Sequence, residues 1–147
     1  MNPHTLDTLV TFAATWPVLA VGHTVSDHIT GQTDTIAAHK ADPGAYGWWA
    51  NLAHVGAYHV SMIVIAGISA LTLGIPWTLP GIYAALAVSV VTHSFLDRRW
   101  PVAALLRALG SPDFAALKQA GMNGVYLADQ ALHHLALLVC AVLLATL

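Results

Sequence analysis

The sequence VYLADQALHHLALLVCAVLLATL, residues 125–147, decides the expected fold of this chain. It exceeds the roughly 20 apolar residues that a helix needs to cross the hydrocarbon core of a bilayer. Asp129 is its only Asp, Glu, Lys or Arg. Three more apolar stretches of comparable length precede it. We therefore predict four transmembrane helices, over residues of about 9–27, 48–73, 77–97 and 124–147.

The composition indicates a lipid environment. Hydrophobic residues make up 57% of the chain and charged residues 8%, with a mean hydropathy of +0.68, whereas soluble domains carry about a quarter charged residues. We predict an all-α integral membrane protein, a four-transmembrane-helix bundle that forms a single domain over residues 1–147. The net charge of −2 gives no support for a nucleic-acid partner. The first residues lack the basic region of a cleaved signal peptide, so we expect them to be retained.

The connections between the helices set the expected orientation. The short connector Gly-Ile-Pro, residues 74–76, makes the second and third helices an antiparallel hairpin. The other two connections, residues 28–47 and 98–123, hold all five Lys and Arg residues. By the positive-inside rule, we expect both long loops in the cytoplasm and both termini outside the cytoplasmic membrane.

The loop between the third and fourth helices is expected to be helical and to lie at the membrane interface. Residues 100–109 are apolar apart from Arg107. Ser111 and Pro112 are typical of a helix N-cap and first turn, and Gly121 is typical of a helix end. The sequence therefore predicts an interfacial helical loop.

Polar side chains recur at one end of each predicted helix. Three pairs are spaced by four residues: His23 with Asp27, His93 with Asp97, and Asp129 with His133. This spacing puts both members of a pair on one helical face. The second helix carries a polar stripe of Asn51, His54, Tyr58 and Ser61. Because all these positions lie toward the two long loops, we expect them to meet roughly 10 Å below one membrane interface.

Side chains of this kind predict a metal site. An ionised Asp inside a membrane costs a few kcal/mol, which a divalent cation would offset. The predicted ligands are His23, Asp27, His54, His93, Asp97, Asp129 and His133. The only cysteine, Cys140, lies in the apolar last segment, so nitrogen and oxygen ligands are expected, favouring zinc, with manganese or iron as alternatives. Seven ligands exceed one tetrahedral site, so either two ions bind or some Asp residues orient the His ligands.

The other His, Gln and Lys residues are assigned by pattern to loops, to solvent or to faces away from the site. They are His4, His28, Gln32, His39, Lys40, His59 and His134.

The motifs read HTVSDHITGQTDTIAAHK over residues 23–40, HSFLD over 93–97 and DQALHH over 129–134. They resemble a family of small bacterial and phage membrane proteins, domain of unknown function 3307. One departure is His28, where the family pattern has an apolar or aromatic residue. The resemblance implies no reaction, but it singles out His23, Asp27, Gln32, Lys40, His54, His93, Asp97, Asp129, Gln130 and His133.

The first functional hypothesis is a metal-dependent hydrolase at the cytoplasmic membrane face. Asp27 or Asp129 would be the catalytic base, taking a proton from metal-activated water. The substrate would be an amphiphilic, lipid-like ester, amide or phosphoester that enters from the membrane lipid. Arg98 and Arg99 could hold an anionic headgroup, although contact with anionic lipid explains them equally well.

Three alternatives stay open. A metal ion transporter or sensor would need a polar path to the outer face, and the outer halves of the helices offer few polar side chains. A haem protein would need axial His ligands, which the paired Asp residues disfavour. A non-catalytic membrane protein could hold the same side chains as a structural His and Asp network. The sequence is compatible with a single chain or a homo-oligomer.

Overall fold

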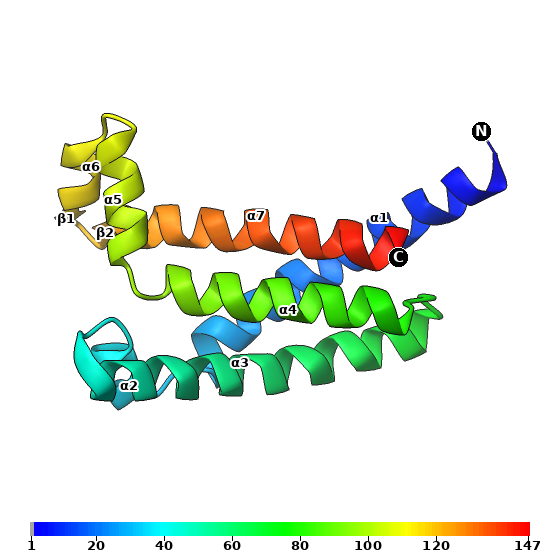
Figure 1. The fold of residues 1–147 in the computed structure, drawn as a ribbon, viewed down its shortest axis with the longest axis horizontal. Helices are drawn as coiled ribbons and strands as arrows, with labels where there is room; N and C mark the ends of the chain where they lie inside the picture. Colours follow the sequence, from blue (N-terminus) through cyan, green and yellow to red (C-terminus); the bar gives the residue numbers. More distant parts are fainter. Residues whose placement is uncertain (1) are drawn as a thin grey trace.

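The computed structural model describes residues 2–147, which are almost entirely helical. Four long helices lie side by side in Figure 1: α1 (Pro3–Val25), α3 (Gly44–Leu73), α4 (Leu79–Leu96) and α7 (Gly124–Thr146). All four are long and apolar enough to cross a membrane. The predicted all-helical chain with four such helices is confirmed.

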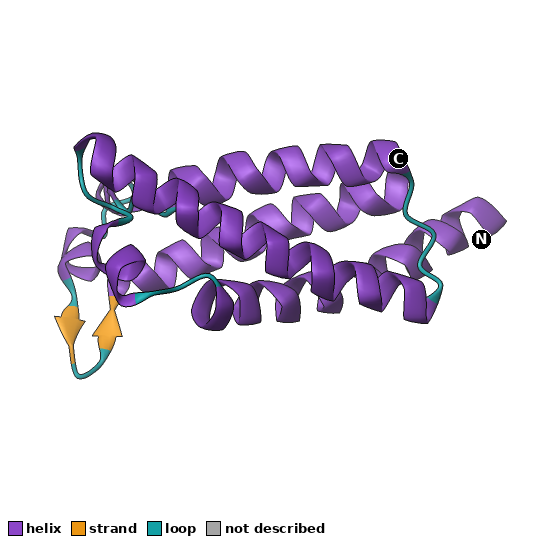
Figure 2. Ribbon diagram, turned by 90° about the horizontal axis from the view of Figure 1, so that it is seen from below, coloured by secondary structure: helices purple, strands orange, loops and turns teal. Residues whose placement is uncertain are grey.

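Short elements gather at the end of the bundle opposite the chain termini (Figures 1 and 2). A π-helical turn, η1 (Ser26–Thr30), continues α1, and α2 (Asp34–His39) follows it. Between α4 and α7 lie α5 (Trp100–Ala108), α6 (Pro112–Ala116) and an antiparallel hairpin of β1 (Lys118–Gln119) and β2 (Met122–Asn123).

Both long loops contain short elements. The first, residues 28–47, holds the end of η1 and the whole of α2. In the second, the predicted helix from Ser111 to Gly121 is wrong beyond its first turns, because α6 ends at Ala116. Ser111 makes no side-chain cap hydrogen bond. Gly121 lies in the hairpin turn at φ +80°, a left-handed conformation that glycine adopts without strain.

The first two long helices begin earlier than predicted, and in α1 a capped first turn precedes the apolar stretch. The Asn2 side chain accepts a hydrogen bond of 2.8 Å from the Thr5 backbone N–H, and Pro3 occupies the first turn of α1. Likewise, α3 begins at Gly44, directly after Pro43. Hydropathy predicts the segment that lipid could cover, but not the helical turns that precede this segment.

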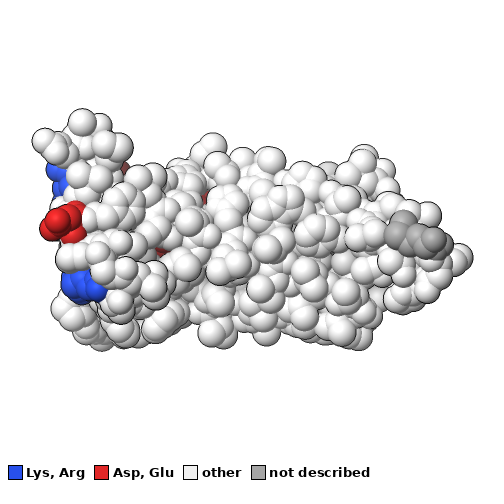
Figure 3. Space-filling model, turned by 90° about the horizontal axis from the view of Figure 1, so that it is seen from above, with Lys and Arg blue, Asp and Glu red and all other residues white. Residues whose placement is uncertain are grey.

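The bundle has a narrow core and an apolar outer surface. The buried cluster draws on all four long helices: Leu19, Tyr58, Met62, Ala85, Leu137, Cys140, Ala141 and Leu144. Large apolar side chains also point outward; Leu71, for example, is 87% exposed. On the face that Figure 3 shows, the Lys, Arg and exposed Asp side chains lie at one end of the molecule, and the rest of that face is almost free of charge. Such a surface is typical of a protein surrounded by lipid.

The start of α3 packs tightly against the loop before it. A Cβ atom on Gly47 would lie 1.9 Å from the backbone oxygen of Asp42. Side chains do not approach backbone oxygen this closely, so only glycine fits without a shift of the loop. Arg98 donates a hydrogen bond to the same Asp42 oxygen, and this contact ties α3 to the end of α4.

We predict that Gly47→Ala lowers the free energy of unfolding by about 1–3 kcal/mol, because the added methyl group displaces the Asp42 carbonyl. Thermal unfolding in detergent measures this. Gly56→Ala is the matched control on the same helix, since a Cβ there meets nothing within 4 Å, and it should be neutral or stabilising by up to about 1 kcal/mol. Equal melting temperatures for the two variants would contradict the tight contact.

Candidate metal centre

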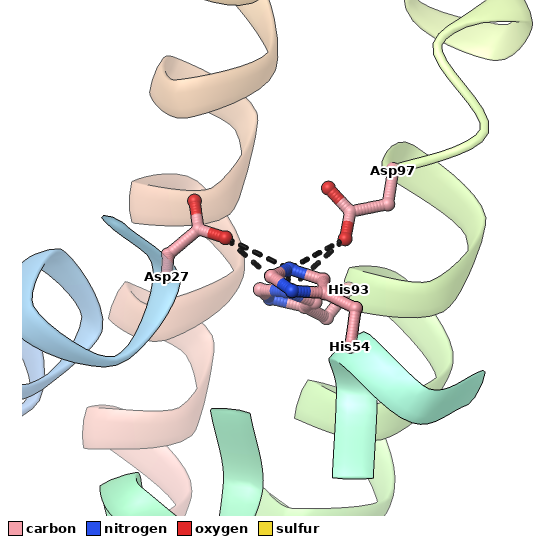
Figure 4. Close-up of side chains that lie close together, drawn as sticks. All are labelled: Asp27, His54, His93 and Asp97. Carbon is pink, nitrogen blue, oxygen red and sulfur yellow. Dashed lines mark hydrogen bonds and ion pairs between the residues drawn. The ribbon is translucent and has the colours of Figure 1, made fainter. Parts of the chain in front are cut away.

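Four buried side chains converge where η1, α3 and α4 meet (Figure 4). Asp27 lies on η1, His54 on α3 and His93 on α4, and Asp97 directly follows α4. All four are at most 2% exposed. π-Helical turns are rare in proteins, and those that occur are often found at functional sites. Here the turn places Asp27 opposite the two imidazoles.

The four donor atoms are spaced as the corners of a metal site. His54 Nε2 lies 2.9 Å from Asp27 Oδ1, 3.0 Å from Asp97 Oδ2 and 3.2 Å from His93 Nε2. His93 Nε2 lies 3.3 Å from Asp97 Oδ2 and 3.8 Å from Asp27 Oδ1. Ligands about 2.0–2.2 Å from a tetrahedral zinc ion are separated by about 3.3–3.6 Å. The observed spacings bracket this range.

The hydrogen bonds of His54 favour a lone pair at the centre of the cluster. Its Nδ1 lies 2.6 Å from the backbone oxygen of Gly31. A carbonyl oxygen can only accept, so Nδ1 carries a proton, and neutral His54 has a bare Nε2. That Nε2 faces the carboxylates of Asp27 and Asp97. A lone pair facing two negative charges is unfavourable, so either the ring is protonated or a cation lies between Nε2 and the carboxylates. Metal-binding His residues commonly donate their second N–H to a backbone carbonyl in this way.

A second group lies on the other side of Asp97. Ligand atoms of Asp97, Asp129 and His133 fall within 4.8 Å of one another. His133 Nδ1 lies 2.9 Å from the Asp129 backbone oxygen, which again leaves Nε2 bare. Asp129 Oδ1 and His133 Nε2 are buried without a hydrogen-bond partner, whereas Asp97 Oδ2 lies 3.0 Å from His54 Nε2. Unpartnered buried polar atoms are rare in proteins, and these two belong to residues of one group. Because Asp97 belongs to both groups, its carboxylate is the one that two ions would share.

Lys40 also enters the cluster, which the sequence pattern did not predict. Its Nζ lies 3.0 Å from His54 Nε2, 3.1 Å from Asp97 Oδ1 and 3.8 Å from Asp27 Oδ1. The residue is only 6% exposed. Lys40 therefore supplies one positive charge next to the first group.

Lys40 alone does not balance the buried carboxylates. Asp27, Asp97 and Asp129 carry three negative charges when ionised, and Lys40 contacts two of them, whereas the buried Arg98 donates to backbone oxygens. Burial alone would raise the pKa of the Asp97 carboxyl, but the neighbouring His54, His93 and Lys40 hold that pKa well below its usual range. Protonation of His54 and His133, which face these carboxylates, or one divalent cation would neutralise the remaining two charges.

His23, a predicted ligand, lies beside the two groups and belongs to neither. Its Nδ1 is 3.1 Å from the Tyr58 hydroxyl, and its Nε2 is 3.3 Å from Gln130 Oε1. Its ring stacks on that of His133 at 5.3 Å between centroids. The Gln130 amide also donates to Asp27 Oδ2 at 2.9 Å. His23 and Gln130 are thus placed to orient the candidate ligands.

Arg98 is not placed to hold a headgroup, because it is absent from the lining of the cavity described below. It is 5% exposed, and its guanidinium donates to the backbone oxygens of Lys40, at 2.8 Å, and of Asp42. The guanidinium also lies 4.5 Å above the Trp48 ring. Arg98 therefore fixes the loop that carries Lys40, and the predicted headgroup role is wrong for this residue.

The three remaining membrane-span histidines lie outside both metal groups, as predicted. Each directs Nδ1 to the backbone oxygen four residues earlier. Beyond that, His28 contacts the Tyr126 hydroxyl, His59 contacts Ser89, and His134 packs edge-on against Trp16. Their Nδ1 atoms are thus held within their own helices, and only the Nε2 atoms of His28 and His59 contact a neighbouring helix.

A cavity of about 490 Å³ opens over the cluster. Its floor contains Asp27, Lys40, Asp97, Asp129 and Gln130, and α5, α6 and β1 contribute its roof. Gln32 also lines it, with a buried Oε1 that has no hydrogen-bond partner. The sequence pattern assigned Gln32 and Lys40 to a loop. Only the family resemblance singled them out beside the predicted metal ligands. The cavity would let a small molecule reach the candidate ligands.

Comparisons with known protein families, with curated proteins and with solved structures found no match. The resemblance of the motifs to domain of unknown function 3307 stays a prediction.

Proposed function

We propose that this chain is an integral membrane metalloprotein that binds two divalent metal ions, most favourably zinc, and hydrolyses an amphiphilic substrate. The observation that carries the proposal is the pair of buried, unpartnered atoms Asp129 Oδ1 and His133 Nε2, in a group whose third member is Asp97. They adjoin a second set with metal-site spacing. Manganese and iron accept the same nitrogen and oxygen ligands.

The competing explanation is a structural network without metal, and Lys40 favours it. The Lys40 ammonium group contacts Asp97 and His54 directly, so it partly replaces a metal ion in the first group. It pairs with neither Asp129 nor His133, whose Oδ1 and Nε2 atoms have no partner. A network selected only for stability would leave no such atoms buried, because each costs about 1–3 kcal/mol.

We predict that the purified protein carries about two zinc, manganese or iron ions per chain, measured by elemental analysis. His133→Ala and His93→Ala should each lower the content to about one ion, and Asp97→Ala should lower it furthest, because Asp97 belongs to both groups. His134→Ala is the matched control, because His134 is adjacent to His133 in sequence but belongs to neither metal group. Wild type with no more metal than Asp97→Ala would refute the metal site.

The cavity gives the cluster the access that catalysis needs. When bound, a metal ion lowers the pKa of a coordinated water toward 7. The carboxylates of Asp27 and Asp129 both line the cavity and are the candidate bases. Asp27 Oδ2 accepts a hydrogen bond from Gln130, whereas Asp129 Oδ1 has no partner. Asp129 would act as the base only if it does not ligate the second ion, and Asp27 only if it does not ligate the first, so both are tested.

We predict that the protein hydrolyses at least one compound in a panel of amphiphilic esters, amides and phosphoesters. Asp129→Asn should lower kcat by about 10²–10⁴-fold, the range for loss of a general base. Asp27→Asn tests the other candidate, and His134→Ala should keep near-normal turnover. Equal turnover by the wild type and both Asp variants would remove the hydrolase proposal.

Metal transport is the weaker alternative. Beyond Tyr58, the core on the side of the termini is formed by apolar side chains such as Met62, Leu137 and Leu144. Within residues 2–147, an ion leaving the cluster in that direction would meet Thr11 and Thr15 as buried polar side chains but no buried charged one.

We propose that the cavity faces the cytoplasm and that the termini lie outside, because all basic residues lie at the cavity end. In a Cys140→Ala background, Asp113→Cys should react with a membrane-impermeant maleimide only in inverted vesicles. Pro76→Cys, in the α3–α4 connector, should react only in right-side-out vesicles. The reverse pattern would overturn this orientation while leaving the site unaffected.

A further inference from the structure

The roof of the cavity is basic. Arg99 lines it from the N-cap of α5, Arg107 from the end of α5 and Lys118 from β1. With Lys40 on the floor, four of the five Lys and Arg residues of the chain border one cavity. Lys40 is distant in sequence from the other three, so the fold brings these four basic side chains to one cavity.

The three roof residues have no carboxylate partners. Within residues 2–147, none of them takes part in a salt bridge, whereas Lys40 pairs with Asp97 and Asp27. The acidic side chains that line the cavity all belong to the metal groups on its floor. A ligand in the cavity therefore meets unpaired positive charge on one side and the candidate metal ligands on the other.

The backbone holds Arg99 in an unfavourable conformation. Its φ of +61° is one of two positive values among non-glycine residues in the described chain. Such strain costs about 1–3 kcal/mol and occurs preferentially at binding sites. It lies at the sharp turn between α4 and α5, where the side chain reaches the cavity and lies 3.4 Å from the Ala37 backbone oxygen.

One edge of the cavity suits an apolar chain. Trp100, Ala103, Val125 and Tyr126 line it beside the basic residues. Trp100 is 61% exposed at the end of the bundle, where Trp side chains commonly lie at a membrane interface. A molecule with a charged head and an apolar tail could place the head under the roof and the tail along this edge.

We propose that the cavity binds a phosphate monoester or diester, with Arg99, Arg107 and Lys118 holding the phosphoryl oxygens. Guanidinium groups bind phosphate through paired, charge-assisted hydrogen bonds. This assignment rests on the proposed hydrolase and narrows its substrate class to phosphoesters. A dinuclear metal site suits this chemistry, because two ions can stabilise the attacking and leaving oxygens together.

The test measures binding to the purified protein in a neutral detergent by native mass spectrometry, with three probes. Lauroyl lysophosphatidate carries phosphate and a chain, glycerol 3-phosphate carries phosphate alone, and monolaurin carries the chain alone. We expect a phosphate probe to bind and monolaurin to bind at least tenfold more weakly. Preference for lysophosphatidate over glycerol 3-phosphate assigns a lipid headgroup as the source, and equal affinity assigns a soluble phosphate ester.

The variants separate a built site from general attraction. Arg107→Gln should weaken binding of the phosphate probe by about tenfold or more, as expected for loss of one charge-assisted hydrogen bond. Gln119→Glu changes the net charge by the same amount at a position on β1 that does not line the cavity, and it should have less than a twofold effect. Equal weakening by both variants, or equal binding of monolaurin, would overturn the phosphate site.

Metal content measured on the same samples distinguishes this inference from the function on which it rests. Protein that binds the phosphate probe through Arg107 but contains no metal refutes the hydrolase and keeps the anion site. Protein that contains metal but binds monolaurin as tightly as lysophosphatidate refutes the anion site and keeps the metal centre.

Discussion

The burial of three carboxylates inside an apolar helix bundle is the constraint on which the rest of the structure depends. Asp27, Asp97 and Asp129 are each at most 6% exposed. An uncompensated charge in such a place would favour opening of the bundle. One buried lysine offsets part of the charge, and the rest requires protonated His side chains or a further cation. The proposed metal ions would supply that charge.

Several local features can be understood as consequences of this constraint. The π turn at the end of α1 places Asp27 within reach of His54, and the backbone oxygen of Gly31 holds that imidazole with its Nε2 inward. Arg98 anchors the loop from which Lys40 enters the cluster. The narrow glycine contact at the start of α3 keeps the same loop close to the helix. The end of the bundle toward the loops is thus organised around the polar cluster, while the other end is an ordinary apolar core.

Helix periodicity was enough to predict much of this arrangement. The pairs His93 with Asp97 and Asp129 with His133 are local, so spacing of four residues placed both on inward faces, and the four apolar stretches placed the pairs at one end. Lys40 and Gln32 lie in a loop whose path depends on Arg98 and on packing against α3, which no local pattern encodes. His23 has the same spacing as the other pairs, but Tyr58 and Gln130 contact its ring nitrogens. Only the three-dimensional arrangement could reveal those contacts.

The most direct test of the metal centre is anomalous diffraction from crystals of the wild-type protein, recorded at the absorption edge of the metal that the protein carries. The account predicts a peak about 2.0–2.2 Å from His54 Nε2, His93 Nε2 and the Asp27 and Asp97 carboxylates. It predicts a second peak between Asp97, Asp129 and His133, about 3.5–4 Å from the first. The Lys40 ammonium group at the centre of the cluster, with no anomalous peak at either position, would contradict it.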